Sequence, residues 1–471
     1  MRRAVTTVAA ACLLAGPTVL AFFSGGYFAE PLVISGIVVW ALVLALAVAG
    51  PAPLPAGGPG RVALGGLVAF TAWSAISLAW APLGAAAVHN LQRLVLYVGT
   101  FLLAVGVLRV PRALRAAEPV LAAGATIVIG YGLAGRLLPS IVDLSRSESA
   151  DGRLEQPITY WNGTGALAAM GFLLCARLAG DRTRPAVLRA AAAAATAPLG
   201  AGVYLSYSRG AIAVALLGLV VLVAAAPARS QLRAGAVALA AGGLAAVAAV
   251  AFPGVATAES DPSDGAIVLT ILVLLAAAAA AVIARQGTSG DDRLARARLL
   301  KPLAAAAVAA AVIGLLVGGL GERPSAAELA AGAGAERLTT ASSNRYEYWR
   351  VGLDAFAREP LTGLGSGGFR VAWLKERSIQ EAVRDAHSLE VEAAAELGIP
   401  GLVTLALLIG GVAAAARRAL RLHGGAAAGA TAVTLAWLLH ASIDWDWQLP
   451  AVTLPALVLA GALVALSERG R

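Results

Sequence analysis

One stretch that decides the fold reads Ala266-Ile-Val-Leu-Thr-Ile-Leu-Val-Leu-Leu-Ala-Ala-Ala-Ala-Ala-Ala-Val-Ile-Ala284. It carries no charge over nineteen residues, close to the ~20 that an α-helix needs to cross the hydrocarbon core of a bilayer. Hydrocarbon offers the backbone no hydrogen-bond partners, so such a segment must be a helix or a barrel strand. Barrel strands alternate polar and apolar residues, and this stretch does not. The sequence therefore predicts a transmembrane helix here.

Similar stretches recur along the whole chain. Of its 471 residues 59% are hydrophobic and only 13% are charged, whereas a soluble domain carries about 25% charged residues. We therefore predict an all-α fold, a polytopic transmembrane helical bundle of about 12–14 spans. Fourteen ranges qualify: 4–25, 31–50, 62–80, 94–108, 119–135, 158–178, 188–206, 211–226, 234–252, 266–284, 302–320, 397–416, 426–440 and 451–466.

Arginine residues gather in alternate loops between these spans. Short cytoplasmic loops are enriched in Lys and Arg, so the basic loops are assigned to the cytoplasm, and both termini then lie inside. The net charge of +9 is explained by membrane orientation. A nucleic-acid partner is not expected, because that would need a clustered basic face. The basic loops hold Arg61, Arg109, Arg112, Arg115, Arg177, Arg182, Arg184, Arg189, Arg229, Arg233, Arg285, Arg293, Arg296, Arg298, Lys301, Arg417, Arg418 and Arg421.

Residues 321–396 form the longest hydrophilic interruption, and the same topology places them outside. The chain is thereby divided into 1–320 with about eleven spans, an extracytoplasmic loop at 321–396, and 397–471 with about three spans. Long loops in compact proteins are usually functional or disordered. Tyr346, Trp349, Leu353 and Phe356 recur at helical spacing in this loop. We therefore expect the loop to be folded and largely helical.

Two features of this loop invite a chemical interpretation. The run Pro360-Leu-Thr-Gly-Leu-Gly-Ser-Gly-Gly-Phe369 is rich in glycine, but a dinucleotide fingerprint needs a preceding strand and a βαβ unit, so a structural turn is favoured over a phosphate cradle. Further on, His387 and Glu390 are three residues apart and are expected to share a helix face, and Gly398 with Pro400 should end that helix. The other three histidines are scattered, so no zinc site is expected.

Four pieces of the chain together resemble the O-antigen ligase and polymerase superfamily, with the stretch from Arg153 to Asn162 as a further point of likeness. They are Ser206-Tyr-Ser-Arg-Gly-Ala211, Asn344-Arg-Tyr-Glu-Tyr-Trp349, Pro360-Leu-Thr-Gly-Leu-Gly365 and the stretch from His387 to Gly401. The resemblance implies a multi-pass protein of the bacterial cytoplasmic membrane, typically with about twelve spans. It also implies transfer of a glycan from a polyprenyl-pyrophosphate carrier to an acceptor hydroxyl on the outer face of that membrane, the acceptor being a glycan, a lipid or a protein.

The resemblance also implies roles for individual residues. Arg209 and Arg345 would hold the carrier pyrophosphate, and His387 would act as the general base, with Arg153 and Arg350 as supporting candidates. These residue types suit the chemistry. A guanidinium binds phosphate oxygens bidentately and stays charged, and a histidine near its ordinary pKa can accept the acceptor's proton. Because guanidinium groups supply the electrostatic stabilisation, neither a metal nor a cofactor is expected.

Plainer interpretations stand beside these. Arg209 could be an interfacial residue whose head group reaches the membrane surface, Arg345 could pair with an acid of the loop, and His387 could be a capping residue. The run Asp444-Trp-Asp-Trp447 is typical of an interfacial aromatic belt, with carbohydrate contact as the alternative.

Two competing classes of function also remain open at this stage, and within the enzyme class a polysaccharide polymerase differs from a ligase only in using a second carrier-linked glycan as acceptor. A transporter or lipid-linked glycan flippase would place ionisable residues inside spans, and the predicted spans have none near their centres. If the protein were a non-catalytic membrane scaffold, the motifs in the loop would be coincidental.

Overall fold

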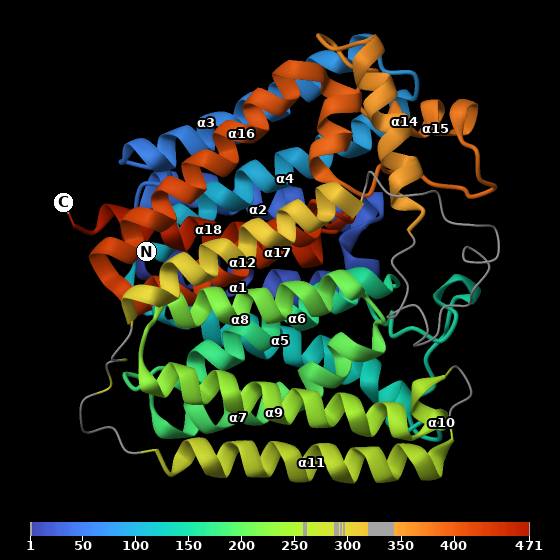
Figure 1. The fold of residues 1–471 in the computed structure, drawn as a ribbon. Helices are drawn as coiled ribbons and strands as arrows, with labels where there is room; N and C mark the ends of the chain where they lie inside the picture. Colours follow the sequence, from blue (N-terminus) through green and yellow to red (C-terminus); the bar gives the residue numbers. More distant parts are fainter. Residues whose placement is uncertain are drawn as a thin grey trace.

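The computed structural model describes residues 2–257, 261–286, 292, 294, 297–318 and 343–470. All regular secondary structure in these ranges is helical, and the long helices lie side by side in a bundle (Figure 1). The prediction of an all-α, polytopic helical bundle is confirmed.

The long helices follow one another in chain order. They are α1 (Arg2–Ala21), α2 (Ala29–Ala49), α3 (Gly58–Ile76), α4 (Gly84–Leu108), α5 (Pro111–Leu137), α6 (Trp161–Gly180), α7 (Ala186–Leu205), α8 (Arg209–Ala225), α9 (Arg229–Ala251), α11 (Pro262–Ala284), α12 (Ala297–Gly318), α16 (Leu389–His423), α17 (Ala428–Ala441) and α18 (Pro450–Glu468). Shorter helices are α10 (Pro253–Ala256), α14 (Arg345–Arg358) and α15 (Phe369–Glu376), with 3-10 turns at Ser24–Gly26 and Asp446–Gln448 among others.

Eleven stretches among the described residues are long and apolar enough to cross a membrane. One of them, Leu389–Ala441, contains both α16 and α17, and two further apolar helices, Arg209–Ala225 and Leu299–Ala310, are shorter. When α16 and α17 are counted separately and the two short helices are added, each of the fourteen predicted ranges corresponds to one helix. The chain is a multi-pass membrane protein.

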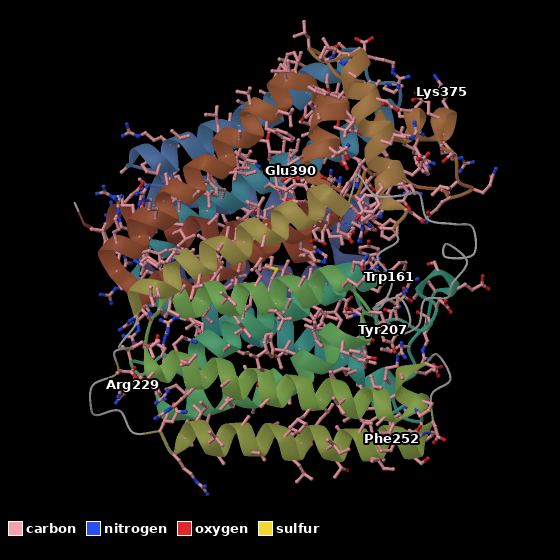
Figure 2. All side chains as sticks on the ribbon, in the orientation of Figure 1. Trp161, Tyr207, Arg229, Phe252, Lys375 and Glu390 are labelled. Atoms are coloured by element: carbon pink, nitrogen blue, oxygen red, sulfur yellow. The ribbon has the colours of Figure 1, made fainter. Side chains whose placement is uncertain are left out.

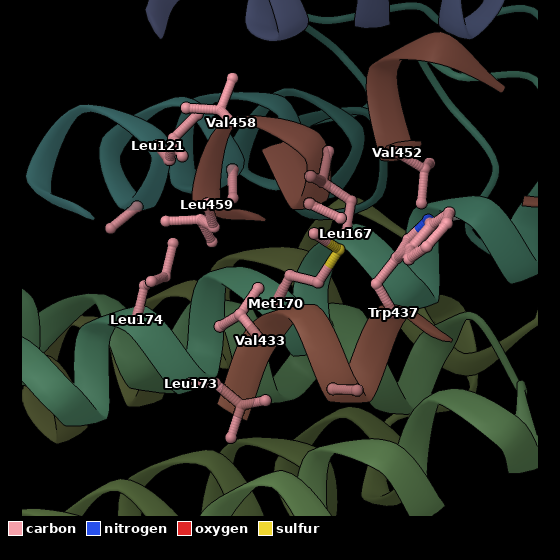
Figure 3. Close-up of a cluster of buried hydrophobic side chains, with 14 of the residues drawn as sticks. Leu121, Leu167, Met170, Leu173, Leu174, Val433, Trp437, Val452, Val458 and Leu459 are labelled. Atoms are coloured by element: carbon pink, nitrogen blue, oxygen red, sulfur yellow. The ribbon is translucent and has the colours of Figure 1, made fainter. Parts of the chain in front are cut away.

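Helices α6 and α18 occupy the centre of the bundle, since the most apolar stretch of each is buried along its whole length. Figure 3 shows their side chains meeting those of α5 and α17, with Leu167, Met170 and Leu173 of α6 against Val433 of α17 and Leu459 of α18. Lipid tails are as apolar as these residues, so packing rather than water exclusion holds such helices together.

The two ends of the bundle differ in what they carry. Both chain termini lie at one end, here named the termini end, while α14, α15 and α10 lie at the other, here named the loop end (Figure 1). Figure 2 shows Trp161, Tyr207 and Lys375 toward the loop end and Arg229 toward the termini end. The described part of the long loop, residues 343–396, therefore gathers at the loop end. Residues 321–342 of that loop, with Arg323 and Arg337, lie outside the described residues.

We propose that the loop end faces outward, and cysteine labelling tests this. Lys375 is exposed toward the loop end (Figure 2). Arg421 is exposed next to Leu422, which lies against Gly470 near the C-terminus, and Cys12 is the exposed native cysteine. In a Cys12→Ser background, an impermeant maleimide is expected to label Lys375→Cys in intact cells and Arg421→Cys only after permeabilisation. The reverse labelling pattern would overturn the orientation.

Most helices begin earlier than predicted, and α4, α5 and α16 do so by eight residues or more. Helix α4 starts at Gly84 and α5 at Pro111, so that Arg93 and Glu118 fall inside these helices, where both are buried. The sequence ranges missed these turns because polar residues such as His89 and Asn90 dilute the apolar signal. Ionisable residues thus lie inside two of the observed helices, although the shorter predicted spans carry none near their centres.

Candidate active site

A cavity of about 720 Å³ opens at the loop end between the membrane helices and the loop. It is lined by residues from five separate segments, at 24–28, 149–162, 207–209, 343–348 and 381–387, together with Trp445 and Leu449. Arg153, Arg209, Arg345 and His387 all line it. The structure thus brings four of the five candidate site residues to one cavity from distant parts of the sequence.

His387 lies in the chain segment just before α16. Its backbone has a positive φ of 53°, and the helix begins after it at Leu389, with the Ser388 hydroxyl accepting a hydrogen bond from the Val391 N–H. His387 and Glu390 therefore do not share a helix face as predicted. The predicted break is confirmed further along, because α16 is interrupted at Gly398, where φ is 62°.

The surroundings of His387 select one tautomer of its ring. Nδ1 lies 3.0 Å from the carbonyl oxygen of Asp385, and a carbonyl oxygen can only accept a hydrogen bond. Nδ1 therefore carries the proton in the neutral ring, and the lone pair is on Nε2. The ring is held between Tyr348 and Trp445, at centroid distances of 5.0 and 6.3 Å. A neutral imidazole held in this way can accept a proton at Nε2.

Arg345 is the first residue of α14 and forms an ion pair with Asp444, ninety-nine residues away. The Asp444 side chain has no exposed surface and that of Arg345 is 23% exposed. Asp444 also accepts a 2.5 Å hydrogen bond from the Tyr160 hydroxyl, which in turn accepts one from the Asn162 side chain. Burial is the largest single effect on Asp444 and opposes its ionisation, but the charges of Arg345, His387 and His440 and the Tyr160 hydrogen bond together outweigh burial and hold the pKa of Asp444 below its ordinary value.

Arg209 lines the cavity as the first residue of α8, where Ser208 caps the helix through the Ala211 N–H. The positive end of the helix dipole adds to the Arg209 charge at this point, which favours a bound anion. Behind Ser208 lies a buried polar chain. His440 places Nε2 3.4 Å from the Ser208 hydroxyl and Nδ1 2.5 Å from Asp446. The segment 444–446 thereby supports both arginines, through Asp444 for Arg345 and through Asp446, His440 and Ser208 for Arg209.

Arg153 and Arg384 complete the basic lining of the cavity. The Arg153 guanidinium lies 3.6 Å from the centroid of the Trp161 ring, within the range of a cation–π contact, and Arg384 donates a hydrogen bond to the Tyr27 hydroxyl. Four arginines thus face two acids, Glu381 and Asp385. Burial raises the pKa of Asp385 against the opposing effect of nearby Arg93, which weakens its negative contribution.

The glycine-rich turn has a structural role, as the sequence analysis favoured. Its Gly367 and Phe369 N–H groups donate to the Glu396 carboxylate at 2.8 and 3.1 Å, and the Gly365 N–H donates to the Glu396 carbonyl. Gly363, Gly365 and Gly367 all have positive φ, which glycine adopts at little cost. Because the protein's own carboxylate fills the place where a phosphate would bind, the turn anchors the loop to α16.

Arg350, the fifth candidate, lies elsewhere. Its guanidinium is paired within α14 with Glu347 at 2.7 Å and Asp354 at 2.9 Å, and it does not contribute to the lining of the cavity. The role of Arg350 is therefore in an ion-pair network within α14 and not in the cavity.

The sequence analysis missed several residues around the cavity. Asp444 and Asp446 lie in a run that was interpreted as an aromatic belt, yet both are buried and each contacts a basic side chain. Trp447 of the same run is buried against Tyr97 and Trp437, which excludes a belt position for it. The signal available in the sequence was the alternation of two acids with two tryptophans, because an aromatic belt does not require acidic residues.

One comparison with known proteins bears on this site. Residues 263–406 match the sequence model of the family described as O-antigen ligase. This match supports the O-antigen ligase superfamily for that part of the chain. The matched region extends from α11 into α16 and contains Arg345 and His387, whereas Arg153 and Arg209 lie before it. No protein with a curated function shows a significant match to the chain.

The match supports a membrane function of the glycan ligase or polymerase type. Within the described residues, His, Cys, Asp and Glu side chains form no group of three or more that could hold a metal ion.

Proposed function

We propose that the protein transfers a glycan from a polyprenyl-pyrophosphate carrier to an acceptor hydroxyl at the loop end, which is the outer face of the cytoplasmic membrane. The observation that carries the proposal is the gathering of Arg153, Arg209, Arg345 and His387 around one cavity. Guanidinium groups match pyrophosphate oxygens in charge and geometry, and an oriented imidazole lies beside them.

A second cavity supports a donor with a hydrocarbon tail. It measures about 890 Å³, is lined almost wholly by apolar side chains, and runs between α8, α12, α16, α17 and α18. Leu389 and Trp447 border this apolar cavity, while His387 and Trp445, each two residues earlier, border the basic one. A molecule with a pyrophosphate head and an isoprenoid tail fits two adjoining spaces of this kind.

The proposed reaction follows from these positions. The acceptor hydroxyl gives its proton to Nε2 of His387 as its oxygen attacks the anomeric carbon of the carrier-linked sugar. The bond between that carbon and the pyrophosphate oxygen breaks, and the pyrophosphate leaves with the bonding electron pair. Arg209 and Arg345 stabilise the added negative charge. The products are a glycosidic bond, polyprenyl pyrophosphate, and a protonated imidazole that returns its proton to solvent.

In vitro transfer by purified protein in nanodiscs tests the proposal. With a polyprenyl-pyrophosphate glycan as donor, Arg209→Gln is expected to bind carrier about 10- to 100-fold more weakly, the range for losing hydrogen bonds to a charged group. Arg350→Gln is the matched control, because Arg350 is paired within α14 and lies off the cavity. Equal loss in the two variants, or no transfer by the wild type, would contradict the proposal.

Two further readouts complete this experiment. We propose that transfer needs no metal, so a chelator should leave the rate unchanged. Deletion of the gene followed by analysis of surface glycans then identifies the acceptor, because loss of attachment indicates a ligase and single-repeat products indicate a polymerase.

A further inference from the structure

Five aromatic side chains line the basic cavity in an unbroken series of ring contacts, here named the aromatic strip: Phe28, Tyr27, Trp445, Tyr160 and Trp161. Consecutive ring centroids are separated by 5.5, 5.5, 4.5 and 5.1 Å in that order. The members come from the chain between α1 and α2, from the start of α6 and from the loop after α17. Three distant parts of the sequence thus converge on one surface.

The strip lies where the apolar core meets the cavity, because Tyr160 belongs to the core and Tyr27, Trp161 and Trp445 pack against it. Its members border the cavity, and the Phe28 side chain is 59% exposed. The polar edges of the rings are held in place, since the Tyr27 hydroxyl accepts a hydrogen bond from Arg384 at 3.2 Å and the Tyr160 hydroxyl donates to Asp444. Fixed edges orient the ring faces. Burial and the nearby Asp444 charge also raise the pKa of Tyr160, so its hydroxyl remains a donor.

This chemistry matches a chain of sugar rings. A pyranose has an apolar C–H face, which stacks on an aromatic ring, and a rim of hydroxyls, which needs oriented polar partners. Along the strip, arginine and carboxylate groups lie beside the aromatic faces, with Arg153 at Trp161 and Arg384 at Tyr27. Ring spacings near 5 Å are comparable with the length of one sugar unit, so several consecutive sugars could be accommodated.

His387 divides the strip into two halves. Its ring meets the strip at Trp445, the central member, at 6.3 Å between centroids. On one side, Tyr160 connects through Asp444 to Arg345, and Trp161 carries Arg153. On the other side, Tyr27 leads to the exposed Phe28. The half with Tyr160 and Trp161 thus adjoins Arg345 and Arg153, and the half with Tyr27 and Phe28 adjoins Arg384.

We propose that the aromatic strip is a saccharide-binding subsite in two halves, an inference that rests on the proposed transfer function. Tyr160 and Trp161 bind the sugar nearest the carrier pyrophosphate. Tyr27 and Phe28 bind at least one sugar of the acceptor, whose hydroxyl reaches His387 above Trp445. The acceptor is therefore a glycan or a glycosylated lipid rather than an unmodified protein side chain.

Kinetics with separately varied donor and acceptor test the two halves. Phe28→Ala is expected to raise KM for the acceptor glycan about tenfold and leave KM for the donor within twofold, and Trp161→Ala should do the opposite, in keeping with the strength of one ring contact. Phe23→Ala is the matched control, since Phe23 is 57% exposed, lies close to Phe28 in sequence and does not line the cavity. Both variants should bind farnesyl pyrophosphate, a sugar-free probe, as the wild type does.

Direct binding separates failure of this inference from failure of the proposed function. The ligand is the delipidated oligosaccharide released from the carrier-linked glycan pool of the host, and its binding is followed by saturation-transfer NMR. If the wild type binds the oligosaccharide, Phe28→Ala and Trp161→Ala bind it more weakly, and no transfer is detected, the strip is supported and the proposed transfer function is contradicted. If both variants transfer glycan normally with unchanged KM values, the saccharide-binding role of the strip is contradicted and the transfer function is not. The same conclusion follows if both variants lose farnesyl pyrophosphate binding to an equal extent.

Discussion

His387→Ala is expected to slow glycan transfer about 10²- to 10⁴-fold, the usual contribution of a positioned general base, while carrier affinity stays near that of the wild type. The Nδ1 contact with the Asp385 carbonyl leaves the lone pair on Nε2, and the ring borders the same cavity as Arg209 and Arg345. Carrier affinity depends on those arginines and on the apolar cavity. Single-turnover transfer and farnesyl pyrophosphate binding measure the two effects separately.

The positive φ of His387 allows a loss of activity to be distinguished from a loss of folding. Alanine is strained at φ 53°, whereas glycine and asparagine tolerate that region. His387→Gly and His387→Asn should therefore be more stable than His387→Ala and equally inactive. The matched control is His423→Ala, because His423 lies at the termini end against the Leu466 carbonyl. Near wild-type turnover in any His387 variant would remove it from the mechanism.

Arg345→Ala is expected to cause the largest loss of stability, because it leaves Asp444 buried without its ion-pair partner. Breaking a buried pair costs about 3–5 kcal/mol, and the lower end applies because Arg345 is partly exposed. Carrier binding should also be lost. The variant Arg345→Met with Asp444→Leu removes both charges and should recover part of the stability while remaining inactive, because the Tyr160 hydroxyl then loses its acceptor.

Thermal unfolding in detergent and farnesyl pyrophosphate binding distinguish these effects. The pKa of Asp444 is lowered in the folded protein, so its ion pair stabilises the fold above the ordinary Asp pKa of about 3.9, and this contribution is lost as the pH falls through the folded value. The stability gap between the wild type and the Arg345→Ala variant should persist at neutral pH and narrow only in strong acid. A double variant that regains carrier binding would contradict a direct role for Arg345.

Much of the fold could be predicted from the sequence because a membrane helix is determined by its own local stretch of residues. A continuous apolar run such as 266–284 specifies a helix without reference to the rest of the chain. Where polar residues begin a helix, as before Arg93 in α4, the same rule failed. The conformation of His387 was also missed, because three-residue spacing suggests a helix face and does not reveal a left-handed residue before a cap.

The candidate site was only partly accessible from the sequence. Arg209, Arg345 and His387 were found through their short motifs, and the structure places them together. Their supports were not found, because each joins positions far apart in the chain: Arg345 with Asp444, Tyr160 with Asp444, and Ser208 with His440. No periodicity or composition encodes such pairings, and a buried acid beside tryptophans looks in sequence like an interfacial one.

The origin of the cavity in several distant segments has a consequence for protein engineering. The matched region, residues 263–406, supplies Arg345 and His387 but leaves Arg153, Arg209 and Trp445 to the rest of the chain. The matched region therefore does not contain the whole candidate site and cannot be exchanged between proteins by itself. A chimera that exchanged this region alone would combine Arg345 and the proposed base of one protein with Arg209 of another, and it would divide ion pairs such as that of Arg345 with Asp444. Productive recombination with a related protein should therefore require that residues 153–162, 207–209 and 444–446 be exchanged together with the loop.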